Sequence, residues 1–366
     1  MFGLGMTIAA FLGSTRRGGF KQTALSPVPS FINKFGQGIN EDLSQFDLPV
    51  PAAEFEEAMK VLHRPDFVIV ARYGGHMVNP EESRFAVAGS GAGMRLVVIE
   101  PMPPAGLFIQ YFDSVENWAE WVLDRLDPMR IARERKRLIP TDKLDWEELL
   151  HLLHSADMYR SCYYQSMLDH APLDEFAFSK TQYIEALHDA ILSVDWRWLV
   201  PCLMSMIPGA VPDSVLGLTD RMECLRRFGL ITDSDSGLLK FTEAGQELGT
   251  EFMLQWVSAL GLEVFTGNDR QAEGSRLLAL GTNAGTHLFE FEKQGPKAEI
   301  TYRIVGESGV IESLQKFMEG LKPAGLERPR QTPPPIQTAP VGKFCTQCGK
   351  KLEAGSKFCP SCGAKI

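Results

Sequence analysis

The stretch SRFAVAGSGAGMRLVVIE (83–100) places three glycines between two apolar runs. Glycines at this density occur in loops that bind nucleotide phosphates, but such a loop leaves a strand and opens a helix. Here the residues after Gly93 are β-branched and apolar, which is typical of a second strand. Because glycine adopts positive φ without penalty, we interpret the stretch as a β-hairpin whose glycines form the turn.

The same pattern returns 192 residues later, in SRLLALGTNAGTHLFEFE (275–292). Apolar positions recur on both sides of the turn, so the repeated unit is strand, turn and strand. Aligned without a gap, the two stretches are identical at Ser83/Ser275, Arg84/Arg276, Gly89/Gly281, Ala92/Ala284, Gly93/Gly285, Leu96/Leu288 and Glu100/Glu292.

The repeat extends beyond the hairpins. At an offset of 193, FVIVARYGG (67–75) lies over LGLEVFTGN, and FINKFG (31–36) lies over CLRRFG. After the hairpins, 106–126 and 298–321 each predict a strand followed by an amphipathic helix. Two repeats are too few for a solenoid, so we expect an α+β fold of two pseudo-symmetric modules. Each module consists of a helix, an antiparallel sheet with a hairpin, and a closing helix.

The repeat sets the domain boundaries that we predict. The regions are 1–126 (first module), 127–212 (helical connecting segment), 213–321 (second module), 322–343 (proline-rich linker) and 344–366 (zinc ribbon).

The composition is that of a folded protein that lacks a membrane anchor. Hydrophobic residues make up 44% of the 366 residues, and no apolar run has the length of a membrane helix. The net charge of −9 argues against a nucleic-acid binder over the whole surface. The apolar run 2–13 lacks preceding basic residues and a cleavage site, so we expect core packing rather than export. Its counterpart in the repeat is LVPCLMSMI (199–207).

The connecting segment predicts two helices, DWEELLHLLHSADMYRSCYYQSMLDH and SKTQYIEALHDAILSVDWRWLV. The first contains Glu147, Glu148, His151 and His154, with the Glu-x-x-His spacing of carboxylate-bridged metal sites. Such sites need two Glu-x-x-His motifs together with further glutamates on facing helices, whereas this spacing arises easily by chance on a helix surface. We therefore assign no metal to these residues.

RIARERKRL (130–138) concentrates five basic residues. Glu134 interrupts the run, so we interpret it as the solvated face of a helix rather than a contact for an acidic partner. The basic residues are Arg130, Arg133, Arg135, Lys136 and Arg137.

LTDRMECLRRFGLITDSDSGLLKFTEAGQEL (218–248) resembles the second half of a winged-helix domain. That resemblance implies a helix that reads DNA and a wing that carries basic residues for phosphate. Here the wing contains Asp233 and Asp235, which repel phosphate. The helix carries Arg221, Arg226 and Arg227. We expect a winged-helix-like element rather than a DNA reader.

The last 24 residues carry the most specific motif. Cys345, Cys348, Cys359 and Cys362 have the spacing C-x2-C-x10-C-x2-C, which suits tetrahedral zinc. Disulfides are the alternative, but the other three cysteines are scattered and odd in number. The segment resembles the short zinc-ribbon domains at the ends of many bacterial proteins. Four thiolates fill the coordination sphere, so the site is expected to be structural.

The linker 322–343 has six prolines and no apolar periodicity, as in an extended tether. From Lys343 onward, the sequence contains five lysines and one glutamate, so the ribbon is basic whereas the rest of the chain is acidic. A small basic module on a flexible arm suggests a docking element.

The two-module arrangement, with AAEFEEAMKVLHRPDFVIVARYGG (52–75), is similar to EspG-type chaperones of type VII secretion. That resemblance implies two quasi-symmetric halves that hold secreted partner proteins in the cytosol. It carries no functional residue across, and the zinc ribbon departs from that family.

Three hypotheses about function follow. The first is a non-enzymatic cytoplasmic adaptor or chaperone that binds protein partners and carries a zinc-ribbon docking module. The second is a DNA-associated regulator that uses 218–248 and the ribbon. The third is an enzyme, although the sequence contains none of the common catalytic motifs.

Overall fold

The computed structural model confirms the α+β fold class, with helices and antiparallel sheets. It divides the chain into two compact units, Met1–Ala324 and Gly325–Ile366. The residues that the structure describes all lie in the first unit. They are 2–35, 52–75, 78–90, 93–102, 106–127, 130, 133–134, 138–170, 177–210, 221–254, 256–266, 270–282, 284–292 and 298–321. None of the helices in these ranges has the length and apolar character needed to cross a bilayer.

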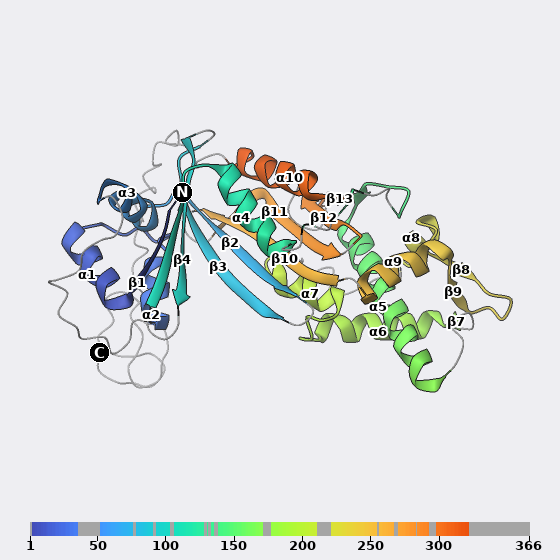
Figure 1. Ribbon diagram of the computed structural model, residues 1–366. Helices are drawn as coiled ribbons and strands as arrows, with labels where there is room; N and C mark the ends of the chain where they lie inside the picture. The colour runs from blue at the N-terminus through green and yellow to red at the C-terminus, as the bar shows by residue number, and fades with distance from the viewer. Residues whose placement is uncertain are drawn as a thin grey trace, which may run out of the picture. The chain divides into compact units, whose positions relative to one another are not determined.

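A ten-stranded antiparallel sheet forms the centre of the first unit (Figure 1). Its strands follow the order β1-β5-β4-β3-β2-β10-β11-β12-β13-β6. The first half contributes β1 (Phe2–Thr7), β2 (Phe67–Gly75), β3 (Val78–Ala88), β4 (Arg95–Met102) and β5 (Gly106–Phe112). The second half contributes β6 (Lys143–Leu144), β10 (Trp256–Thr266), β11 (Arg270–Thr282), β12 (Thr286–Phe291) and β13 (Ile300–Val305).

The two halves have the same strand order about the β2–β10 pair, as the repeat predicts. At the sequence offset of 193, Val70 is the equivalent of Glu263, and the register pairs these two residues with each other. An antiparallel pair of equivalent strands that meet at equivalent residues has a local two-fold axis. The pseudo-symmetry of the sequence is therefore a pseudo-two-fold axis at the centre of the sheet.

One face of the sheet is covered by the two closing helices, α4 (Val115–Leu126) and α10 (Glu307–Glu319). Figure 1 shows these equivalent helices next to one another, and they are in contact. Beneath them, buried residues from both halves form one cluster, which includes Ile69, Trp118, Leu262 and Leu314. This shared core joins the two halves on that face.

On the opposite face, the first half is covered by α1 (Ile8–Gly18), α2 (Val28–Phe35) and α3 (Ala52–His63). Their apolar residues pack on β1, β4 and β5, and Leu4 and Phe11 are buried in this cluster. The predicted core packing of the N-terminal run is thus confirmed. Its predicted counterpart is wrong, because 2–7 form edge strand β1 whereas Leu199–Met206 form helix α7. The edge position in the second half belongs to β6.

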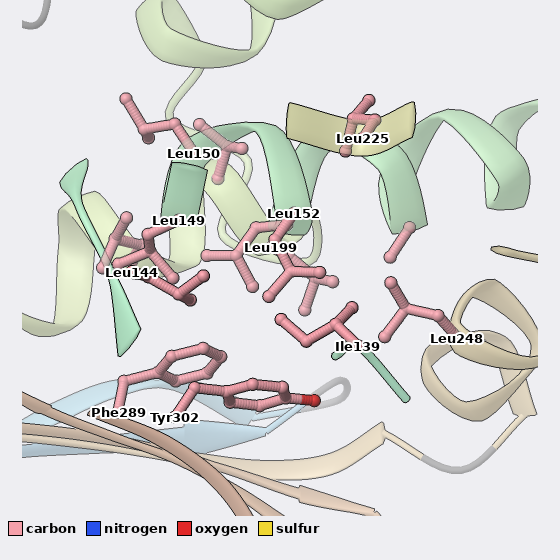
Figure 2. Packing of buried hydrophobic residues seen from close by; sticks show 14 of the residues in the cluster. Ile139, Leu144, Leu149, Leu150, Leu152, Leu199, Leu225, Leu248, Phe289 and Tyr302 are labelled. Carbon is pink, nitrogen blue, oxygen red and sulfur yellow. The ribbon is translucent and has the colours of Figure 1, made fainter. Parts of the chain in front are cut away.

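The second half carries a larger helical layer on the same side of the sheet. It consists of α5 (Trp146–Asp169), α6 (Lys180–Leu192), α7, α8 (Glu223–Arg227) and α9 (Glu243–Leu254). Figure 2 shows leucines of α5, α7, α8 and α9 above Phe289 and Tyr302 of the sheet. The predicted boundaries after 126 and 212 stay a prediction, and the segment between them contributes β6 to the sheet.

The winged-helix-like element has the predicted order of helix, strand, turn, strand and helix. Strands β8 (Ile231–Asp233) and β9 (Leu239–Phe241) form a hairpin, and Gly237 at its turn has a φ of 75°. A strand that the sequence does not signal, β7 (Ala177–Phe178), pairs with β9 and completes a three-stranded sheet.

Both predicted glycine hairpins are confirmed as β3–β4 and β11–β12. The predicted reason for glycine, a positive φ at the turn, holds only in the first hairpin, where Gly89 has a φ of 84°. Gly281 and Gly285 have no positive φ. A Cβ atom at Gly281 would lie 2.6 Å from Ser258 Oγ, and one at Gly285 would lie 2.7 Å from the carbonyl oxygen of Arg133. Glycine is needed in the second hairpin for close approach of neighbouring segments.

The interpretation of the basic run as a helix face is wrong for its described residues. Arg130 lies outside any helix, with a φ of 52°, and its guanidinium pairs with Glu120, Asp124 and Glu307. Arg130 therefore connects the two closing helices. Arg133 of the same run is also outside any helix. The remaining basic residues of the run, Arg135, Lys136 and Arg137, lie outside the described residues.

Equivalent glycines allow a matched test of the close approach. Gly285→Ala is expected to lower the free energy of unfolding by about 1–3 kcal/mol, because the new methyl group overlaps a backbone oxygen. Gly93→Ala is expected to change it by less than about 0.5 kcal/mol, since no atom lies within 4 Å of a Cβ there. Urea unfolding followed by circular dichroism measures both. Equal losses in the two variants would contradict this account.

Candidate functional site

The helical layer of the second half begins with two well-capped helices. Asp145 and Glu148 form a capping box at the start of α5, with both side chain–backbone hydrogen bonds at 2.9 Å. Ser179 and Gln182 form the equivalent box at the start of α6. These boxes satisfy N–H groups that a helix end leaves without partners, which is why the helices begin at these residues.

The Glu-x-x-His residues of α5 have structural roles. Glu148 completes the capping box and pairs with Arg227. His151 Nδ1 lies 3.1 Å from the Tyr183 hydroxyl, and His154 Nε2 donates to the Tyr183 carbonyl oxygen at 3.1 Å. Burial lowers the pKa of His154 to about 3, so the ring is neutral. Within the described ranges, no three His, Cys, Asp or Glu side chains are placed to hold a metal ion.

A buried ion pair fixes α7 against α5. Asp157 accepts from Arg160 Nη1 at 2.8 Å and from the backbone N–H of Val200 at 3.2 Å. Trp198 at the N-cap of α7 makes no side-chain cap, so Asp157 supplies the missing acceptor from another helix. Burial raises the pKa of Asp157 to about 6, while Arg160 and the N–H groups of α7 act in the opposite direction.

Beside this ion pair lies a pocket of about 250 Å³ between α5, α6 and the start of α7. Its apolar walls come from Met158, Ala186, Ala190, Trp198 and Pro201, and its polar lining from His154, Asp157, Ser161, Asp189 and Ser193. The residues on either side of Ser193 are Leu192 and Val194, which are 82% and 90% exposed. Two highly exposed apolar side chains next to an apolar pocket mark a candidate binding surface.

The arginines of the winged-helix-like element are paired with carboxylates of the same chain. Arg221 contacts Asp145 and Glu147, Arg226 contacts Glu223 and Asp233, and Arg227 contacts Glu148. Asp233 and Asp235 are exposed in the wing, as the sequence predicts. The element therefore offers little unpaired positive charge to a phosphate backbone.

The predicted zinc ligands Cys345, Cys348, Cys359 and Cys362 lie outside the described residues, as does the linker 322–343. The zinc-ribbon family model matches residues 344–366, which include all four cysteines. The resemblance of this segment to a zinc ribbon is thus confirmed. The assignment of the individual ligands stays a prediction.

A chain in the solved structure of the Mycobacterium tuberculosis type VII secretion system chaperone EspG5, in complex with the PE25–PPE41 dimer, is similar to this one. The identity is 13% and the TM-score is 0.43, over 88% of this chain and 97% of the other. The likeness agrees with the EspG-type resemblance of the sequence and supplies no argument about function. No curated protein matches the sequence.

The pocket between α5, α6 and α7 is not predictable from the sequence, although α5 and α6 are. Periodicity indicates which positions share a helix face, but it does not show which apolar residues stay exposed once the helices pack. A weak signal existed in α6, where apolar residues occupy more than one face and only Tyr183 and Leu187 are buried. That excess of apolar positions is what leaves Leu192 exposed.

Proposed function

We propose that the protein is a non-enzymatic cytoplasmic adaptor or chaperone, which binds a protein partner through its helical layer and carries a tethered zinc ribbon. The observation that carries this proposal is the apolar pocket between α5, α6 and α7, with Leu192 and Val194 exposed on either side of Ser193, which lines it. Burying two such side chains in a contact removes apolar area from water, which stabilises association.

The apolar character of this surface favours a protein over a small polar substrate. The pocket lining is mostly apolar, and two more apolar side chains, Leu192 and Val194, are exposed next to Ser193 of the lining. An apolar anchor of a partner helix or loop fits such a surface, with the flanking contacts around it. The acidic residue Asp189 of α6 is exposed and lines the pocket, where it offers a polar contact to a partner.

The thiols of the body support a reducing compartment. Cys162, Cys202 and Cys224 are free in the described residues, and burial raises the pKa of Cys162 to about 11 and that of Cys224 to about 12. Unpaired, unreactive thiols are ordinary in cytosolic proteins.

The donor set of the ribbon fits zinc. Four thiolates from Cys345, Cys348, Cys359 and Cys362 are soft ligands that fill a tetrahedral site, and bound zinc would stabilise a segment too short to bury a core. A closed site of this kind holds a fold and leaves no position for a substrate. We assign to the ribbon a docking role, because it is basic beside an acidic body.

The regulator hypothesis has less support. The three arginines of the winged-helix-like element already pair with carboxylates, and its wing is acidic. Phosphate contacts supply most of the free energy of non-specific DNA binding, so a DNA reader needs unpaired basic residues at this element.

Removal of the predicted ligands tests the zinc assignment. Metal analysis of the purified protein is expected to give about one zinc per chain, and a Cys345→Ser/Cys348→Ser variant about none. The thermal unfolding of the body is expected to stay unchanged, since the four cysteines belong to a different compact unit from the body. Full zinc content in the variant would defeat the assignment.

A charge placed at the rim of the pocket tests the partner surface. Leu192→Glu/Val194→Glu is expected to reduce recovery of the partner from the native host by about tenfold or more, because a carboxylate replaces the apolar contact. The high exposure of both positions means that the body stays folded. Quantitative mass spectrometry of proteins recovered with the tagged chain measures the effect.

Met102→Glu is the matched control, since Met102 is also an exposed apolar residue, at 42%, and does not line the pocket. Recovery of the same proteins by the double variant and by this control would argue against the pocket as the binding surface.

A further inference from the structure

On the face opposite α4 and α10, the central strands carry a network of charged side chains. Arg72 Nη1 lies 2.5 Å from Glu263 Oε2, and Arg72 Nε lies 3.0 Å from Glu82 Oε2. Arg276 Nε lies 3.5 Å from Glu263 Oε1, and Arg84 Nε lies 3.0 Å from Glu82 Oε1. Three guanidinium groups thus share two carboxylates near the pseudo-two-fold axis.

Arg84 and Arg276 are equivalent by structure as well as by sequence. Arg84 pairs with Val70 across β2 and β3, and Arg276 pairs with Glu263 across β10 and β11. Val70 and Glu263 are the two residues at the axis. The environments of the two arginines can therefore be compared directly.

The comparison shows an asymmetry. The side chain of Arg276 is 8% exposed, and its Nη2 donates to the Gly209 carbonyl oxygen at 2.6 Å. Met206, the last residue of α7, lies close to Gly261 of β10. A Cβ atom at Gly261 would lie 2.2 Å from the carbonyl oxygen of Met206. In the second half, a backbone segment after α7 thus occupies the space over the sheet and supplies an acceptor to the arginine.

In the first half, no described segment occupies the equivalent space over Arg84. The Arg84 side chain is 47% exposed and contacts Glu82. Arg84 lines two adjoining cavities of about 360 Å³ and 300 Å³, which share Pro27, Ser30 and Arg84. Val68, Val70 and Phe265 form an apolar part of the floor of the first cavity, whose lining is otherwise mostly polar, and Arg72 and Lys34 also line the walls. We call these two cavities the Arg84 groove.

We propose that the Arg84 groove binds an extended peptide segment of a partner protein, with an acidic side chain on Arg84 and an apolar neighbour on the floor. The second half contains a built-in analogue of this contact, where Arg276 donates to a backbone carbonyl oxygen above the equivalent strands. The groove would bind a carboxylate more strongly than a carbonyl group, because the hydrogen bond is then charge-assisted on both sides.

Charge complementarity supports this occupant. Arg72, Arg84 and Lys34 line the groove against Glu82, whereas the whole chain carries a net charge of −9. A locally positive, partly apolar groove in an acidic protein selects an acidic segment and repels few of its charges. This site is separate from the pocket between α5, α6 and α7, so it is a second contact beyond the proposed function.

An array of short peptides, in which each glutamate-containing peptide has a glutamine-containing twin, tests the proposal with the full-length protein. We expect a set of peptides with apolar residues beside the glutamate to bind, and their twins to bind about tenfold more weakly. Arg84→Gln is expected to remove the difference between twins. Ser30→Trp, which fills the groove and keeps its charge, is expected to remove binding to both twins.

Arg95→Gln is the matched control. Arg95 is 48% exposed, pairs with Glu57 and does not line the groove, so the preference for glutamate is expected to persist. Leu192→Glu is also expected to retain it, which separates this result from a failure of the helical pocket. A preference that survives in Arg84→Gln would overturn the proposal. So would equal displacement of both twins by inorganic phosphate, because the groove would then be a site for small anions.

Discussion

The antiparallel pairing of β2 with β10 is the contact on which the rest of the body depends. It joins two five-stranded halves in one sheet, and both central strands bury apolar side chains on the face that α4 and α10 cover. Without this pairing, each half would expose an edge strand that carries buried side chains such as Ile69 and Leu262. The closing helices α4 and α10 can share one core only because the pairing places them on the same face.

The candidate binding surfaces lie where the two halves differ. The first half has α1–α3 on its second face, whereas the second half has α5–α9 and the winged-helix-like element. This larger layer forms the apolar pocket that Ser193, next to Leu192, lines. The turn after α7 lies over Arg276, whereas no described segment fills the equivalent space over Arg84. Duplication preserves the shared sheet, while each copy can acquire its own surface.

The sequence was sufficient to predict the parts of the fold that depend on local pattern. The repeated glycine hairpin, the offset and the helices α5 and α6 follow from periodicity and turn chemistry. Contacts between distant segments were not predictable. The close approach at Gly281, the pairing of β6 with β13 and the ion pairs of Arg130 depend on which elements become neighbours. For the same reason, the sequence indicated the cysteine motif but not the helical pocket.

Site-specific photo-crosslinking from position 192 in cells of the native host tests the central claim most directly. Leu192 is 82% exposed and adjacent to Ser193 of the pocket lining, so a photoreactive residue there reports what contacts this surface. The account predicts a crosslinked protein that is absent when the same residue is placed at position 102. Crosslinks to nucleic acid, or the same products from both positions, would contradict the proposal that this surface binds a protein partner.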